Sequence, residues 1–214
     1  MTLIARPFLK YALACLAVAL TIIVAIIGAQ AAAPDEDHAG AVMVRKLTED
    51  QYRRSISDIF GADIKVVGRI EPDLRVDGLL AVGTGAVSVT PGGFEQYETI
   101  ARGIAAQVTD ETHRGKLIGC APGPGDAAGE KCAAAFFRKI GLQLYRRPLT
   151  EAKVKALAAQ TLLSAKELGT FHNGLSAVLA GMLSSPDFLF RIDRPASSSE
   201  QVDAWSKASR LSFL

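Results

Sequence analysis

The sequence predicts an all-α protein, in which an N-terminal signal or anchor helix is followed by amphipathic helices in a small antiparallel bundle. Apolar residues recur at helical spacing through most of residues 44–195, and residues typical of helix caps precede these runs. The links between the last three runs are short, which favours antiparallel neighbours. A long irregular loop is predicted at about 62–89, where Gly and Val are frequent and no helical period is present.

The first 33 residues have the layout of a secretory signal peptide. Arg6 and Lys10 precede an uncharged apolar stretch, Tyr11–Gly28, and small residues suited to cleavage follow it. The apolar stretch approaches the ~20 residues that span a bilayer, so an uncleaved membrane anchor is the alternative. Either form exports the rest of the chain, and we expect a periplasmic, outer-surface or membrane-anchored location. Residues 34–43 are predicted to form a tether.

Residues 44–110 are predicted to form an N-terminal helical module that contains the long loop. Its first helix, 48–60, begins at Thr48, which has the spacing of a capping box with the Gln three positions on. Its second helix, 91–108, follows a Thr-Pro pair, in which Thr is a favoured N-cap and Pro a favoured first residue.

Residues 111–195 are predicted to form a three-helix module with a disulfide loop. The helices are expected at 127–146, 151–168 and 172–185, each ended by Gly or Pro. Residues 196–214 contain a further helical run that stops without Gly, Pro or a polar tail. We interpret this run as the start of a following domain that is truncated here.

Cys120 and Cys132 are predicted to form a disulfide. An exported chain meets an oxidising compartment, where two cysteines close in sequence are most simply bonded. The third cysteine, Cys15, lies in the targeting segment and leaves an even number. A single link over so short a loop contributes roughly 2–3 kcal/mol. The alternative is two free thiols packed as small apolar groups.

Charge and motif content exclude several kinds of function. Removal of residues 1–31 takes away Arg6 and Lys10, which leaves 22 basic residues against 22 acidic ones. A neutral chain without a basic stripe is a poor partner for a phosphate backbone, so we expect no nucleic-acid partner. No haem-attachment, zinc, nucleophile or nucleotide motif is present. We therefore predict no catalytic, metal or cofactor site within this chain.

Four charged residues are candidates for structural ion pairs: Arg146, Arg147, Asp187 and Arg191. The first two follow one another at a predicted helix C-terminus, where cations suit the helix dipole. One of them is expected to pair with a carboxylate such as Asp187 or Asp193 and to brace two helices. Asp187 and Arg191 lie four residues apart, which predicts an ion pair along one helix. The alternative for the arginines is binding of an anion or carboxylate.

Several stretches resemble the planctomycete-type secreted-domain family. The most specific are RRPLT at 146–150 and SSPDFLFR at 184–191, which occur in the family's order. Residues 47–61, LTEDQYRRSISDIFG, resemble its opening, and residues 88–105, SVTPGGFEQYETIARGIA, resemble a later capped helix. At 77–80 this chain has DGLL, where the family has Asp-Gly-Phe-Asp-Asn, which puts a ligand site there in doubt.

The resemblance covers about residues 44–214 and implies the N-terminal portion of a long exported protein. Such proteins are built from serial domains of unknown function, and some carry a cytochrome c-like haem domain or carbohydrate-binding modules. The family has no established activity, so the resemblance implies a context and no reaction.

Two functions from different classes follow. The first is a non-catalytic scaffold or binding part of a larger envelope protein, whose partners are missing C-terminal domains or another envelope protein. Its ligand would be a polysaccharide or an electron-transfer protein, and Trp205 and Phe188 would offer a stacking platform unless they are core aromatics. The alternative is the front part of an exported hydrolase or haem-linked oxidoreductase, whose active site lies in the missing C-terminal region.

Overall fold

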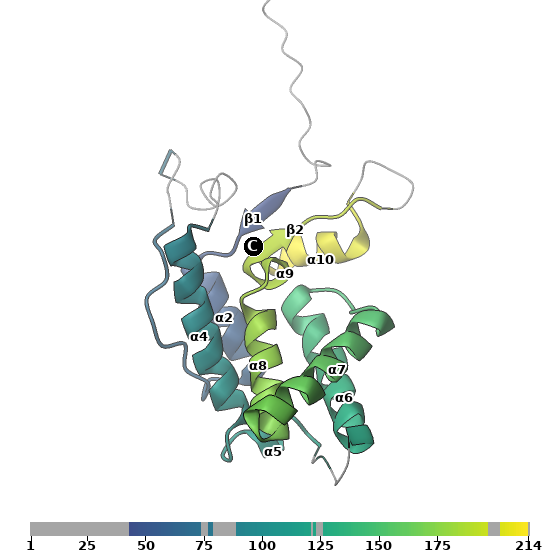
Figure 1. Cartoon of the computed structure of the whole chain (residues 1–214). Helices are drawn as coiled ribbons and strands as arrows, with labels where there is room; N and C mark the ends of the chain where they lie inside the picture. Colours follow the sequence, from purple (N-terminus) through teal and green to yellow (C-terminus); the bar gives the residue numbers. More distant parts are fainter. Residues whose placement is uncertain are drawn as a thin grey trace, which may run out of the picture. The chain divides into compact units, whose positions relative to one another are not determined.

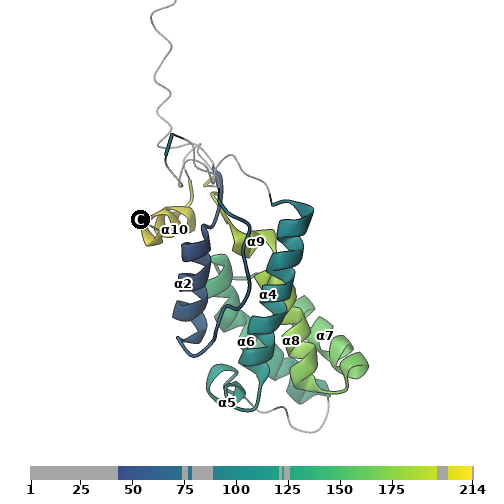
Figure 2. The same ribbon diagram turned by 90° about the vertical axis from the view of Figure 1, so that its left-hand side faces the viewer.

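Helix α8 (Phe171–Leu183) lies between two longer helices, α4 (Pro91–Thr109) on one side and α7 (Glu151–Leu168) on the other (Figure 1). Helix α6 (Asp126–Tyr145) packs against α7, and α2 (Glu49–Phe60) packs against α6 (Figure 2). The mostly helical content confirms the predicted all-α class.

The structure is a computed structural model that describes residues 43–73, 77–78, 89–120, 122, 126–196 and 202–213. These residues belong to one compact unit, Gly40–Leu214. The predicted signal or anchor segment and almost all of the predicted tether lie outside the described residues, as does much of the loop at 62–89. Within the described part, no helix is long and apolar enough to cross a membrane.

Threonine residues cap the N-termini of the four helices α2, α4, α7 and α8. The hydroxyls of Thr48, Thr90, Thr150 and Thr170 each accept a hydrogen bond from the backbone N–H three residues on, at 3.0–3.2 Å. These bonds satisfy N–H groups that have no partner inside the helix. The capping box predicted at Thr48 is present. Helix α7 has its predicted bounds, because Gly169 adopts the left-handed φ of +84° that ends it.

Several short elements were not predicted. Strand β1 (Val44–Lys46) pairs antiparallel with β2 (Phe190–Ile192), and α9 (Pro186–Leu189) leads directly into β2. Helix α5 (Arg114–Leu117) follows α4. These elements are too short to show a hydrophobic period, so the sequence gives no signal for them. The last helix, α10 (Ala204–Ser212), falls within the final stretch predicted to be helical.

The two predicted modules share one core. The Tyr52 ring of α2 lies 5.5 Å from the Tyr97 ring of α4 and 5.3 Å from the Phe188 ring of α9. All three side chains are at most 2% exposed. Residues 44–110 and 111–195 therefore do not form separate cores.

Helices α7 and α8 approach closely at Gly174. A Cβ atom at this position would overlap the carbonyl oxygen of Thr161 and would lie 2.6 Å from the backbone nitrogen of Ala165. Because both neighbours are backbone atoms of α7, they cannot move aside by a rotamer change. Gly174 therefore sets the spacing of the two helices.

Cys120 and Cys132 are bonded, as predicted, with their Cα atoms 5.7 Å apart. The bond joins the segment after α5 to the second turn of α6. The Cys132 side chain is part of the buried core, so the link anchors the connection between α5 and α6 to that core.

Replacement of Gly174 by Ala should lower the free energy of unfolding by about 1–3 kcal/mol, because the added methyl group forces α7 and α8 apart. The matched control is Gly103→Ala in α4, where a Cβ atom meets nothing within 4 Å. That variant should gain roughly 0.5–1 kcal/mol, since Ala is the better helix former. Urea denaturation of both variants tests the prediction, and equal gains would show that the helices can separate freely.

Replacement of both cysteines by Ala should lower the free energy of unfolding by about 3 kcal/mol, since the unfolded chain regains the entropy of the loop between positions 120 and 132. A reducing agent should destabilise the parent chain by a similar amount and leave the double variant unchanged. Thermal melting with and without the reductant measures both effects. Equal melting temperatures for the parent chain in the two conditions would contradict the prediction.

Candidate functional site

The turn after α6 presents two arginines in different directions. Helix α6 ends at Tyr145, and Arg146 adopts a left-handed backbone with φ of +56°. This conformation costs about 1–2 kcal/mol for a residue other than Gly, so the contacts that the turn permits must outweigh it. Pro148 two residues later keeps the chain from continuing as a helix.

The Arg146 guanidinium binds the end of α9 and the start of β2. Its two terminal nitrogens donate to the carbonyl oxygens of Asp187, Phe188 and Phe190, at 3.3, 2.9 and 3.3 Å. The guanidinium also lies over the ring of Phe213, 5.0 Å from its centroid, at the end of α10. One side chain therefore joins α6, α9, β2 and α10.

Arg146 has no carboxylate within 4 Å among the described residues. Burial of the guanidinium and, to a lesser extent, the nearby charge of Arg191 lower the pKa of Arg146 to about 10. The side chain still carries its charge at neutral pH. A partly buried cation therefore stands here with carbonyl dipoles in place of a counter-ion.

Arg147 turns the other way and holds α10. Its guanidinium donates to Asp203 at 3.1 Å and to the Ser206 hydroxyl at 3.3 Å. The same hydroxyl accepts the backbone N–H of Arg194 at 2.9 Å, and Asp203 caps α10 by accepting the Ser206 N–H at 2.7 Å. Burial acts to raise the pKa of Asp203, but the hydrogen bonds from Ser206 and the charge of Arg147 outweigh it and lower that pKa.

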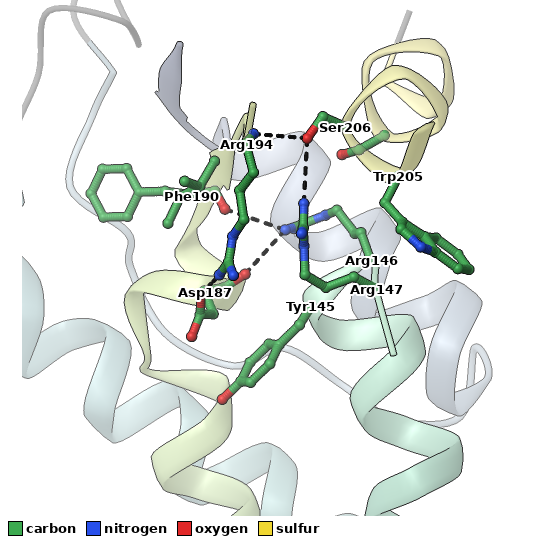
Figure 3. Close-up of a pocket in the computed structure, with 10 residues that line it drawn as sticks. Tyr145, Arg146, Arg147, Asp187, Phe190, Arg194, Trp205 and Ser206 are labelled. Atoms are coloured by element: carbon green, nitrogen blue, oxygen red, sulfur yellow. Dashed lines mark hydrogen bonds and ion pairs between the residues drawn. The ribbon is translucent and has the colours of Figure 1, made fainter. Parts of the chain in front are cut away.

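A small polar cavity opens between these groups (Figure 3). It measures about 20 Å³, and its lining includes Tyr145, Arg146, Arg147, Arg194, Trp205 and Ser209. We call it the arginine pocket.

Two side chains of the arginine pocket stand out. Ser209 is 7% exposed, yet its hydroxyl finds no hydrogen-bond partner among the described residues. Trp205, which belongs to α10, is 45% exposed and lines the same pocket (Figure 3). The pocket lining thus includes a serine whose buried hydroxyl lacks a partner among the described residues and a half-exposed aromatic side chain.

The arginine pocket carries an excess of positive charge. Its lining holds three positive charges, on Arg146, Arg147 and Arg194. Two of these arginines pair with carboxylates. Arg147 pairs with Asp203 at 3.1 Å, and Arg194 pairs with Asp187 at 3.3 Å. One positive charge is left, which is the chemistry of a site for a single anion.

Three of the four predicted ion-pair residues meet at the arginine pocket, but their partners differ from the prediction. The expected pair between Asp187 and Arg191 is replaced by one between Asp187 and Arg194. The reason is that β2 begins at Phe190, so the helical spacing of four residues does not hold. Arg191 instead lies 4.0 Å from the buried Asp193.

The other predicted platform residue, Phe188, does not accompany Trp205 on the surface. Phe188 is 1% exposed and belongs to the core, which was the alternative given for it. Ser206 and Ser209 were missed, although an Asp-x-x-Ser spacing that begins at Asp203 is a recognisable helix-cap signal. Sequence alone does not place that helix on the turn after α6.

A second group of buried charges is structural. Asp193 is fully buried and accepts two hydrogen bonds from Arg210, at 3.0 and 2.7 Å. Lys46 lies 2.8 Å from Asp73, and both side chains are less than a tenth exposed. In the part of the chain that the structure describes, no group of three or more His, Cys, Asp or Glu residues could hold a metal ion.

Two family models match the chain. Residues 45–110 match PSD3, a protein of unknown function (DUF1587), and residues 132–193 match PSD5, a protein of unknown function (DUF1595). The chain contains these two domains. They are the serial domains of unknown function typical of planctomycete-type proteins. No curated protein and no solved structure matches the chain.

The arginine pocket lies across the end of the PSD5 match. Arg146, Arg147 and Asp187 fall inside the matched residues, whereas Arg194 and Ser209 follow them. The site is therefore completed by α10, which lies beyond the PSD5 match.

Replacement of Arg146 by Lys should lower the free energy of unfolding by about 2–3 kcal/mol. The ammonium group keeps the charge but cannot reach three carbonyl oxygens with a planar fork. The control is Arg138→Lys, because Arg138 also makes a two-bond contact, to Glu151, but on the surface. That variant should unfold almost as the parent does. Equal stability of the Arg146 variant and the control would show that charge alone suffices at position 146.

Proposed function

We propose that the chain is an exported, non-catalytic module that binds a carboxylate-bearing ligand in the arginine pocket. The observation that carries the proposal is Ser209, a lining residue of the pocket that is 7% exposed and whose hydroxyl has no hydrogen-bond partner among the described residues. A buried hydroxyl without a hydrogen bond costs about 1–3 kcal/mol. A ligand oxygen in the pocket would remove that cost.

Charge supports a ligand with a single negative charge. The three pocket arginines exceed their two carboxylate partners by one, and Arg146 is the one without a carboxylate partner among the described residues. Asp187 at the pocket would repel a second negative charge on the ligand. A carboxylate matches this balance better than a doubly charged phosphate does.

Size supports a ligand that enters only in part. A cavity needs roughly 10–15 Å³ to hold one water molecule. The pocket, at about 20 Å³, accepts one carboxylate but no ring. The body of the ligand would remain outside, where the half-exposed indole of Trp205 offers a face for stacking. A carboxylate carried on a ring meets both conditions.

The chemistry of the pocket is that of binding. The Arg146 guanidinium keeps its proton at neutral pH, and Asp187 and Asp203 are held in ion pairs. These groups orient and neutralise an anion. Export rests on the targeting segment predicted in residues 1–33, and the envelope is where such a module would meet its ligand.

The test uses galacturonate, a ring that bears one carboxylate, with neutral galactose as the matched ligand. Calorimetry on the purified chain should show binding of galacturonate alone. Ser209→Ala should weaken that binding by about tenfold, as expected for one lost hydrogen bond to a charged group. The same variant should be at least as stable as the parent without ligand, because its buried unpaired hydroxyl is gone.

The control is Ser212→Ala on the same helix, because the Ser212 hydroxyl donates to the backbone carbonyl of Ser209 and does not line the pocket. It should leave binding unchanged. Two results would overturn the proposed function: no binding of galacturonate, or equal binding by the parent and Ser209→Ala. Trp205→Ala should weaken binding without loss of stability, since nearly half of the indole is exposed.

A further inference from the structure

A second, larger hollow shares one lining residue, Tyr145, with the arginine pocket. It lies between α7 and α8, which run side by side (Figure 1), and it measures about 330 Å³. Its lining includes Lys153, Leu157, Gln160, Gly181, Met182 and Ser185. We call it the α7–α8 groove. Its size falls in the range of about 300–1,000 Å³ that small-molecule sites occupy.

Tyr145 lines both hollows. Its phenolic oxygen accepts a hydrogen bond from the Ser185 hydroxyl at 3.0 Å, and Ser185 also lines the groove. From Ser185 the groove extends along α8 to Ala177. The lining residues on α8 run from Ala177 to Met182 and cover about 8 Å of helix, and Ser185 follows the end of α8. The shared residue places the two hollows next to each other.

The groove suits a hydroxyl-rich acidic chain. Lys153 and Gln160 supply charge and hydrogen bonds from α7, while Met182 gives an apolar surface on α8. The residues that line the groove include one cation and no carboxylate. The groove has open space at Gly181, where an added Cβ atom would meet nothing within 4 Å.

We propose that the ligand is an acidic polysaccharide, with one uronate carboxylate in the arginine pocket and the following sugar rings in the α7–α8 groove. This inference rests on the proposed function, because the pocket supplies the anchor. Lys153 is placed to meet the negative charge of a further uronate along the chain. Sugar rings present hydroxyls at their edges and C–H groups on their faces, which matches the mixed lining of the groove.

A peptide fits these walls less well. Extended peptides gain affinity by adding to a sheet edge with free N–H and C=O groups. The walls here are helices, whose backbone groups are bonded within each helix. A docked amphipathic helix would need a broad apolar groove, whereas Lys153, Gln160 and Ser164 line this one.

The test separates the groove from the pocket by ligand length. A galacturonate oligomer should bind the chain about tenfold more tightly than the monomer, an increment of about 1.4 kcal/mol. Gly181→Leu fills the groove without touching the pocket, so it should remove this gain and leave monomer binding unchanged. Gly103→Leu in α4 is the matched control, with equally open space but outside the groove, and it should change neither affinity.

Each outcome supports or overturns the inference. If the monomer binds through Ser209 but the oligomer binds no more tightly, the groove proposal fails and the proposed function stands. If Gly181→Leu leaves the gain intact, the oligomer lies elsewhere and the groove proposal fails. If oligoglutamate of the same charge binds as tightly and is also blocked by Gly181→Leu, the groove takes an acidic peptide, which overturns the sugar assignment. If neither sugar binds, both proposals fail.

Discussion

The guanidinium of Arg146 is the contact on which one end of the fold depends. It satisfies three carbonyl oxygens between Asp187 and Phe190, where a helix of four residues turns into a strand. A helix so short has no stability of its own, because its carbonyl groups lack partners. A planar donor that reaches several acceptors at once resolves this, and the left-handed backbone at Arg146 places it there. Once α9 and β2 are fixed, α10 and the turn after α6 can pack against them.

Contacts at this end of the fold also explain why the two matched domains share one hydrophobic core. Strand β1 lies at the start of the PSD3 match and pairs with β2 at the end of the PSD5 match. Helix α4 of PSD3 packs along α8 of PSD5, and the rings of Tyr52 and Phe188 meet between the two. Each match covers about 60 residues, a length at which a lone core is marginal. Together they bury a continuous core, so their occurrence in series has a physical basis.

The sequence predicts the parts of the fold that depend on local chemistry. The threonine caps at Thr48, Thr90 and Thr150 and the disulfide are set by neighbours in the chain, and each was recoverable from spacing. The partners of Arg146 were not recoverable. The prediction looked for a carboxylate, since charges are visible in a sequence, whereas backbone carbonyls occur at every residue and give no signal. Only the folded arrangement shows which carbonyls lack partners.

The arginine pocket could not be predicted from the sequence for a related reason. Its serine differs from the other residues that have a buried polar atom without a hydrogen bond. Arg191 and Asp193 each leave one buried atom without a hydrogen bond, but those two atoms face each other at 4.0 Å and attract through their charges. The hydroxyl of Tyr52 also lacks a partner within the described part of the chain, but that side chain is fully enclosed by the core. Of these four residues, Ser209 alone lines the arginine pocket. A buried polar atom without a hydrogen bond is a local cost in stability. Such costs are typical of functional sites, where some stability is given up for binding. The cost at Ser209 appears only when α10 lies against the turn after α6, so no pattern within α10 could have revealed it.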